Sequence, residues 1–458
     1  MRPARLGTLV VLVVAALGFL AVVLSISSIR LGPAIDSVST AQVLDGTAVD
    51  TRIGITFTET MNPQSVERGF RIRPSVRGRF DWSGNQLLFT PDHPLRYRTA
   101  YVLTVSPSAM GTTGKHLFRT FRRVLRTQSR QLVFLGTEGA TNHRVVVATV
   151  NDRQSVIGND DGSVTEFSLS FDRTLLVYVR HGRPGERANE LWLASLADGS
   201  TTRVFQHSDW TLSQPHFSPD SNSIVFLATN VRICQRGYPC FRDTAGPIIY
   251  VLDLRTRKAK AFHPRSDVPL TNFIDFSPRG QIAYTDLGSA LTLASPSGVH
   301  PIHIPNRGNS LIYSGFSPIG DKAAFVGQTP YSTGGDVLVY NGNRYLDVSK
   351  GVYDSSTPMF SNDGKQLAYA AYRGEAQNNP VYGINVFNFK TRATTKLTFD
   401  RQWSDWEPQW STDNRYLEFV RSAPQETMYM GSGEIWIIGS NGKGARPIGA
   451  RGTDVHWL

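Results

Sequence analysis

The chain has 458 residues, which is too long for one ordinary domain and suits two or three. Hydrophobic residues make up 40% and charged residues 19%, a balance that excludes an intrinsically disordered chain. The net charge of +11 lies almost wholly in the first 130 residues, because residues 1–30 carry three arginines and no acid, and residues 31–130 carry 14 Lys/Arg against 7 Asp/Glu. Forty glycines and 25 prolines predict many turns between short strands.

Residues 1–30 predict a membrane anchor. The uncharged stretch from Leu6 to Ile29, LGTLVVLVVAALGFLAVVLSISSI, is 24 residues long, and about 20 are enough to span a bilayer as a helix. Because no convincing small-x-small cleavage site accompanies it, we expect an uncleaved single-pass helix with a short cytoplasmic end and a large extracytoplasmic part. A long, cleaved signal sequence is the alternative. For an exported chain whose largest part is near neutral, nucleic acid is not an expected partner.

Residues 31–123 predict a small β-sandwich. The segments RIGITF (52–57) and YVLTVS (101–106) alternate apolar and polar residues, and Pro, Gly and Asn separate them from their neighbours. The segment resembles the bacterial Ig-like domain of the SbsA surface-layer type, which implies a spacer or presentation module. The matching residues are Phe57, Met61-Asn62-Pro63, Ser65-Val66, Trp82, Phe89-Thr90-Pro91, Pro94-Leu95 and Tyr101.

A basic segment follows, with residues 124–130 as a linker. Six cations of residues 115–130 have no acidic residue between them: Lys115, Arg119, Arg122, Arg123, Arg126 and Arg130. They predict a collar for anionic lipid or an anionic wall polymer. A solvated linker without a partner is the alternative.

Residues 131–458 contain a repeat. Six stretches share a large apolar residue, a serine, a turn and an alternating apolar run: LSFDRTLLVY (169–178), FSPDSNSIVF (217–226), FSPRGQIAY (276–284), FSPIGDKAAF (316–325), FSNDGKQLAY (360–369) and WSTDNRYLEF (410–419). Their serines are spaced by 48, 59, 40, 44 and 50 residues. A period of 40–50 residues with several strands per unit is typical of β-propeller blades.

The two ends of this region predict how the ring closes. Residues 131–136, 144–150 and 154–160 look like the last three strands of a blade, and the chain ends on DVHWL (454–458), which looks like the first. Trp457 follows Trp410 by 47 residues, one repeat later. We therefore expect the terminal strand, residues 453–458, to complete a seventh blade; six or eight blades are the alternatives. Closure would remove exposed strand edges.

The repeats resemble the blades of TolB-type propellers, which are relatives of WD-repeat proteins. Pro215, Pro358 and Pro408 match the leading proline of that motif, and the aromatic position is matched by Phe217, Phe276, Phe316, Phe360 and Trp410. The first unit departs from it at Leu169 and Phe171. The resemblance implies the architecture and leaves the function open.

Aromatic and acidic residues before the repeats predict a binding site at the mouth of the ring. Trp210, Tyr353 and Trp403 each lie seven residues before the aromatic residue of their repeat. The predicted binding residues are Trp210, Asp209, Tyr353, Asp354, Trp403, Asp405 and Trp406. Such a set suits a sugar ring or a peptide. Packing of these aromatic residues between blades is the alternative.

Catalytic and metal-binding motifs are not recognisable in the sequence. The repeated Ser and Asp, such as Ser218 and Asp220, are expected to stabilise turns. Cys234 and Cys240 predict a loop disulfide, since two thiols alone do not complete a zinc site. No metal and no cofactor are expected.

The sequence thus predicts an all-β protein with a transmembrane helix (1–30), an Ig-like β-sandwich (31–123), a basic linker (124–130) and a β-propeller (131–458). The expected function is a membrane-anchored extracytoplasmic binding or scaffold protein of the bacterial cell envelope, with a protein or glycan partner. The alternatives are a hydrolase that uses funnel acids on envelope glycans or peptides, and a purely structural envelope component.

Overall fold

The computed structural model describes residues 32–150, 154–158, 163–182, 188–230, 232–233, 239–240, 247–262, 270–286, 289–296, 302–305, 311–327, 335–350, 355–376, 378–426 and 433–458. The predicted anchor, residues 1–30, lies outside these ranges. Within them, no helix combines the length and the apolar character that crossing a membrane requires. Contacts divide the chain into two units: Met1–Thr40, Thr51–Leu95 and Thr99–Thr127 form the first, and Ala41–Asp50, Arg96–Arg98 and Gln128–Leu458 form the second.

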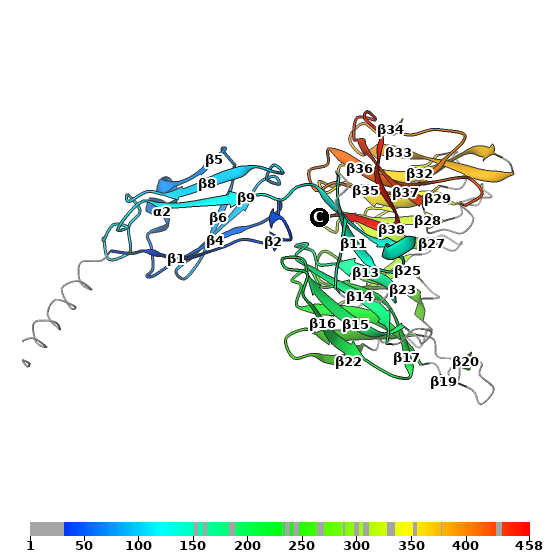
Figure 1. Cartoon of the computed structure of the whole chain (residues 1–458), viewed down its shortest axis with the longest axis horizontal. Helices are drawn as coiled ribbons and strands as arrows, with labels where there is room; N and C mark the ends of the chain where they lie inside the picture. Colours follow the sequence, from blue (N-terminus) through cyan, green and yellow to red (C-terminus); the bar gives the residue numbers. More distant parts are fainter. Residues whose placement is uncertain are drawn as a thin grey trace, which may run out of the picture. The chain divides into compact units, whose positions relative to one another are not determined.

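The first unit is a two-sheet sandwich with one short helix (Figure 1). One sheet has the strand order β1-β4-β7-β6 and the other β5-β8-β9. The elements are β1 Ile35–Ser39, β4 Ile53–Phe57, α2 Pro63–Gly69, β5 Phe70–Arg73, β6 Gly78–Ser83, β7 Gln86–Pro91, β8 Ala100–Val105 and β9 Phe121–Arg126.

The Asn62-Pro63 motif forms the start of α2. The Asn62 side chain accepts a hydrogen bond from the Ser65 amide (3.0 Å), and Pro63 occupies the first turn, where no amide hydrogen is needed. The Ser65 hydroxyl donates to the Asn62 carbonyl (2.8 Å) and accepts from the Met110 amide (2.9 Å). This motif therefore ties the helix to a distant segment of the same unit.

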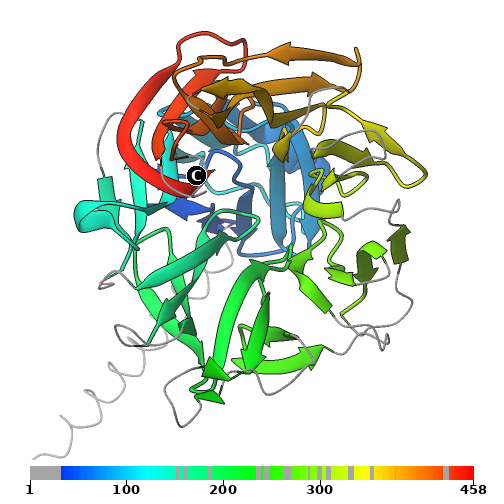
Figure 2. The same cartoon turned by 90° about the vertical axis from the view of Figure 1, so that its right-hand side faces the viewer.

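The second unit contains a ring of antiparallel sheets (Figure 2). Within the described residues, five of its sheets have four strands each in chain order. Their strands are β13 Val164–Leu169, β14 Leu175–His181, β15 Ala188–Ser195 and β16 Thr201–Gln206; β17 Trp210–Phe217, β18 Ser223–Asn230, β21 Ile248–Asp253 and β22 Lys258–Phe262; β23 Leu270–Phe276, β24 Ile282–Asp286, β25 Ser289–Ala294 and β26 Ile302–Pro305; β27 Leu311–Phe316, β28 Ala323–Gly327, β29 Asp336–Tyr340 and β30 Tyr345–Asp347; and β31 Ser356–Phe360, β32 Gln366–Ala376, β33 Asn379–Asn388 and β34 Ala393–Lys396.

A seven-stranded sheet joins the two ends of this unit, in the order β12-β11-β10-β38-β37-β36-β35. Its strands are β10 Gln131–Gly136, β11 Val145–Thr149, β12 Gln154–Val156, β35 Ser404–Trp410, β36 Tyr416–Ser422, β37 Gly433–Gly439 and β38 Arg446–Trp457. The remaining short elements of the unit are β2 Gln42–Val43, β3 Gly46–Thr47, η1 Gly139–Thr141, β19 Arg232–Ile233 and β20 Pro239–Cys240.

Strand β38 pairs with strands from both ends of the chain. Its first half pairs with β37, for example Arg446 with Ile437, and its second half pairs with β10, for example Trp457 with Leu132. Gly452 stands at the crossover and is opposite a glycine on each side, where a β-carbon would collide with Phe134. The terminal strand therefore pairs with residues 131–136.

The repeated Ser and Asp stabilise the turns between the first two strands of the sheets. The Ser218 hydroxyl donates to the Asp220 carboxylate (2.6 Å) and accepts from the Ser223 amide (2.9 Å). The same Ser–Asp hydrogen bond occurs at Ser170, Ser361 and Ser411. The hydroxyl and the carboxylate are thus engaged by the turn itself.

Trp457 anchors the closing strand. Its side chain is 2% exposed, and its indole nitrogen donates to the Gln409 carbonyl (3.3 Å) on β35. The Leu458 amide donates to the Gln131 carbonyl (3.0 Å). The end of the chain is therefore part of the core.

We predict that Trp457→Ala lowers the free energy of unfolding by about 3–5 kcal/mol, because it leaves a cavity in this core. Trp403→Ala is the matched control: the Trp403 side chain is 41% exposed, and its loss should cost about 0.5 kcal/mol or less. Urea unfolding followed by circular dichroism measures both. If both variants lose the same free energy of unfolding, Trp457 does not have a buried role in closing the ring.

Candidate functional site

Two of the predicted binding residues lie at the start of β17. The Trp210 ring stacks on His207 with ring centres 3.8 Å apart, and it contacts Tyr250 at 4.8 Å and Phe205 at 6.4 Å. Phe205 belongs to the preceding sheet, so Trp210 packs between two neighbouring sheets. Asp209 is exposed beside it.

Three further predicted residues lie at the start of β35. Asp405 is completely buried, and its two carboxylate oxygens accept hydrogen bonds from Arg421 at 2.6 and 2.9 Å. Trp406 is 5% exposed and belongs to the core cluster around β38. Trp403 is the exposed member of this group. The side chains of Asp405 and Trp406 are therefore part of the interior of the unit.

The remaining predicted residues lie outside the described ranges. They are Tyr353, Asp354 and one thiol of the expected disulfide, Cys234. The backbone of Cys240 is described, and it pairs with Arg232 across β19 and β20. In the described part of the chain, Asp209 and Trp403 are thus the predicted site residues whose side chains face solvent.

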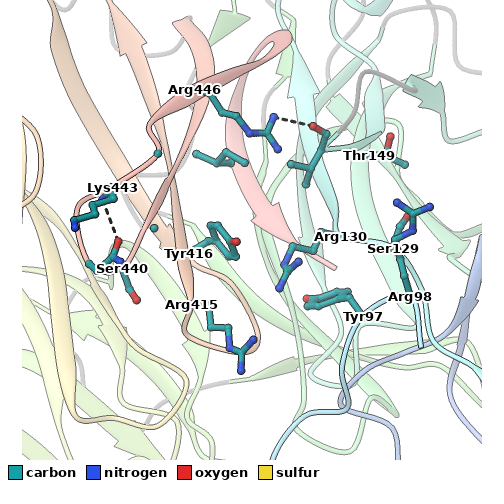
Figure 3. A pocket seen from close by; sticks show the side chains of 15 residues that line it. Tyr97, Arg98, Ser129, Arg130, Thr149, Arg415, Tyr416, Ser440, Lys443 and Arg446 are labelled. Atoms are coloured by element: carbon teal, nitrogen blue, oxygen red, sulfur yellow. Dashed lines mark hydrogen bonds between the residues drawn. The ribbon is translucent and has the colours of Figure 1, made fainter. Parts of the chain in front are cut away.

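The second unit also has a concave surface, lined by charged and polar side chains, that the sequence analysis did not predict. A cavity of about 770 Å³ opens beside the crossover strand β38 (Figure 3). Its lining residues are Tyr97, Arg98, Ser129, Arg130, Thr149, Val150, Arg415, Tyr416, Ile437, Gly439, Ser440, Asn441, Lys443, Gly444 and Arg446, and all of them belong to the second unit. They come from segments at both ends of the chain, which the crossover brings together.

The lining of this cavity is strongly basic. Five of its residues are cationic, and none is acidic: Arg98, Arg130, Arg415, Lys443 and Arg446. Arg98, Arg415 and Lys443 are exposed, and no carboxylate among the described residues forms an ion pair with them. Cations that are gathered in a concave surface attract anions more strongly than the same charges spread over a convex one. We refer to this surface as the basic cavity.

Arg130 is the fixed cation of the basic cavity. Its guanidinium lies over the rings of Tyr97 and Tyr416, 4.7 and 4.8 Å from their centres, and it donates to the Asp413 carboxylate at 3.0 Å. Burial raises the pKa of Tyr97 to about 12, so its hydroxyl stays neutral; this hydroxyl lies 2.5 Å from the Thr412 hydroxyl. The two rings and the carboxylate hold Arg130 in one orientation.

Arg446 is positioned by the opposite wall. Its guanidinium donates to the Val150 carbonyl at 3.1 Å, so it links the start of β38 to the segment after β11. A neighbouring cavity of about 700 Å³ shares Arg98, Ser129 and Thr149 with the first. It adds Asp45, which accepts a hydrogen bond from the Ser129 amide at 3.0 Å. The two cavities are therefore neighbours that share part of their lining.

Sequence reasoning identified only one residue of the basic cavity. Arg130 belongs to the predicted basic collar. The other four cations lie tens to hundreds of residues away from Arg130 in the sequence: Arg98, Arg415, Lys443 and Arg446. The crossover pairing of β38 was the signal that could have found them. It brings the start of β36 and the hairpin between β37 and β38 close to the segment before β10.

Comparisons with known proteins agree with two units of different type. Residues 30–124 match the bacterial Ig-like domain family. No curated protein sequence matches the chain.

Several solved structures are similar to this chain in fold. A prolyl endopeptidase structure is 10% identical with a TM-score of 0.50, covering 80% of this chain and 50% of its own. The second unit is a β-propeller. The oligogalacturonate lyase of Vibrio parahaemolyticus (14% identical, TM-score 0.48) covers 63% of this chain and 82% of its own length. TolB of Acinetobacter baumannii (13%, TM-score 0.41) covers 85% and 82%. At these identities the likeness concerns the fold of the propeller alone.

We predict that Asp405→Asn lowers the free energy of unfolding by about 3 kcal/mol or more, because it removes the charge that pairs with Arg421. Asp209→Asn, at the exposed predicted position, should change it by about 0.5 kcal/mol or less. Thermal unfolding by calorimetry compares the two variants. A neutral effect of Asp405→Asn would return this carboxylate to the candidates for ligand binding.

Proposed function

We propose that this chain is an extracytoplasmic binding protein of the cell envelope, and that its propeller binds an anionic polymer in the basic cavity. The observation that carries the proposal is the convergence of five cationic side chains, without a carboxylate in the lining, on a cavity of about 770 Å³. An anionic group there would gain charge-assisted hydrogen bonds. The polymer chemistry is a repeating carboxylate or phosphate, as in an acidic glycan or a wall polymer.

The architecture supports a scaffold role. In our proposal, residues 1–30 anchor the protein in the membrane as a single-pass helix, and an Ig-like domain of the SbsA type acts as a spacer. Dividing the seven-stranded sheet at β38 gives two groups of four strands, which together with the five four-stranded sheets makes seven blades. A ring of this kind is a scaffold that positions the loops and clefts on its surface.

The geometry supports binding better than hydrolysis. A glycosidase needs two carboxyl groups on either side of the scissile bond. Of the three acids predicted at the funnel, Asp405 is engaged on both oxygens by Arg421 and Asp354 lies outside the described residues. Asp209 alone does not make a catalytic pair.

The test measures binding of the full-length protein, in detergent, to polygalacturonate, to poly(glycerol phosphate) and to neutral dextran. We predict that the triple variant Arg98→Gln, Arg415→Gln, Lys443→Gln weakens binding of the preferred anionic polymer by about tenfold or more. The two anionic polymers distinguish carboxylate from phosphate, and wild-type binding should weaken as salt rises.

The matched control variant removes three cations that do not line the cavity: Arg344→Gln, Lys390→Gln and Lys396→Gln. It has the same net charge as the first variant and should retain wild-type affinity within about twofold. Equal losses in the two triple variants would mean that net charge, and not the basic cavity, attracts the polymer. Equal binding of dextran would contradict the anionic specificity.

A further inference from the structure

The inner strands of the propeller share a bulge. Strands β17, β31, β35 and β38 each shift register near a residue with a positive φ angle: Gln214, Thr357, Glu407 and Asp454. Each lies four residues before the turn serine of its repeat or, in β38, before the last residue of the chain. The bulges therefore occupy equivalent positions in the first strands of these sheets.

Hydrogen bonds connect these bulges from sheet to sheet. The Glu407 amide donates to the Thr357 hydroxyl (3.3 Å), and the Asp454 amide donates to the Glu407 carboxylate (3.4 Å). Further around the ring, the Ile274 amide donates to the Gln214 side-chain oxygen (3.0 Å). Glu407 thus ties the closing strand β38 to β35 at the seam of the ring.

The seam gathers carboxyl groups. Glu407 lies on β35, Glu418 on β36, Asp454 on β38, and Glu166 on the neighbouring β13. Glu418 is completely buried, and neither of its oxygens has a hydrogen-bond partner. Among the described residues, no lysine or arginine forms an ion pair with any of the four. We refer to these four residues as the seam carboxyls.

One histidine is the cation available to this group. The His456 ring nitrogen lies 2.9 Å from the Asp454 carboxylate, and the His456 ring contacts Phe167 edge to face with ring centres 5.6 Å apart. It interacts favourably with the charged form of Glu407 as well. A single partly exposed imidazole does not balance four carboxylates when all are ionised.

The pKa is raised for three of the seam carboxyls. Burial, and after it the neighbouring Asp454 charge, raise the pKa of Glu407 to about 7. Burial also raises the pKa of Glu166 to about 7. The pKa of Glu418 is well above its ordinary value, first through burial and then through repulsion by Glu407 and Asp454. Near neutral pH Glu166 and Glu407 are therefore poised between a neutral and a charged form.

We propose that the seam is a proton-dependent clasp: protonated seam carboxyls hold β38 in place, and their ionisation loosens it and thereby opens the basic cavity. The cavity depends on the seam because Tyr416 on β36 and Arg446 on β38 line it together with Arg130, next to β10. The binding consequence rests on the proposed function, whereas the clasp itself does not.

The direction of the pH effect follows from the raised pKa values. Between about pH 4.5 and 7 the unfolded chain ionises Glu166 and Glu407 while the folded chain keeps them protonated, so stability falls as pH rises. The contribution of the clasp to the free energy of unfolding is therefore complete below about pH 4.5. This contribution is lost as the pH rises through about 7. The folded seam itself acquires charge near pH 7.

The experiment measures amide exchange of residues 446–458 in the full-length protein at pH 6 and pH 8, corrected for the intrinsic pH dependence of exchange, together with the melting temperature from pH 5 to 8. We predict at least a tenfold loss of β38 protection at pH 8 and a melting temperature that falls by several degrees across the range. Peptides of β14 and β15 serve as the internal reference.

The double variant Glu407→Gln, Glu418→Gln should largely remove the pH dependence of β38 exchange, and Glu166→Gln alone should reduce it. Glu375→Gln, at an exposed position on β32, is the matched control and should behave as wild type. His456→Gln separates the contribution of the imidazole from that of the carboxyls. An unchanged pH response in the first two variants, or its disappearance in His456→Gln alone, would overturn the clasp.

Binding of the preferred anionic polymer at pH 6 and pH 8 tests the consequence for the cavity. Weaker binding at pH 8 in wild type, but not in Glu407→Gln, Glu418→Gln, supports control of the cavity by the clasp. Equal binding at both pH values, with β38 exchange still pH-dependent, overturns that control. If no polymer binds while β38 exchange responds to pH, the proposed function fails and the clasp stands.

Discussion

The pairing of β38 with β10 is the contact on which the rest of the propeller depends. It joins residues more than 300 positions apart, so folding must bear a large loop-closure entropy before this ladder stabilises anything. Several close contacts at the end of the chain offset this entropy cost. Trp457 is buried, the Leu458 amide bonds to Gln131, and Gly452 lets three strands meet at one residue. Without this pairing, β10 and the second half of β38 would each present an unpaired edge.

Much of this architecture could be predicted from sequence because its signals are local. Each turn carries its own serine and aspartate, and the hydrogen bonds that these make span only two to five residues. The middle strands can also be recognised in the sequence. Strands such as Leu175–His181 pack between neighbouring sheets, so they appear as nearly continuous apolar runs. The closing strand was predictable for a different reason: the first repeat lacked one strand and the chain end supplied it.

The candidate site was harder to predict because its signals are not local. Asp405 follows Trp403 and precedes Trp406, a pattern that suggests an exposed binding surface. Its partner Arg421 lies directly opposite on the neighbouring strand, and only the register of that hairpin reveals the buried ion pair. The cations of the basic cavity are scattered between residues 98 and 446, and they meet only once β38 has closed the ring.

The cations of the basic cavity and the seam carboxyls differ in how strongly the protein removes them from water. The cations of the basic cavity are mostly exposed, whereas burial raises the pKa of Glu166, Glu407 and Glu418 and favours their neutral form. Strands β36 and β38 bring members of the two groups close in sequence: Glu418 lies on β36 and Arg415 directly precedes it, and β38 carries both Arg446 and Asp454. Protonation therefore acts in two ways on an anionic ligand. It removes repulsion within the seam, which keeps the walls of the cavity together, and it removes negative charge that would weaken the positive field of the cavity.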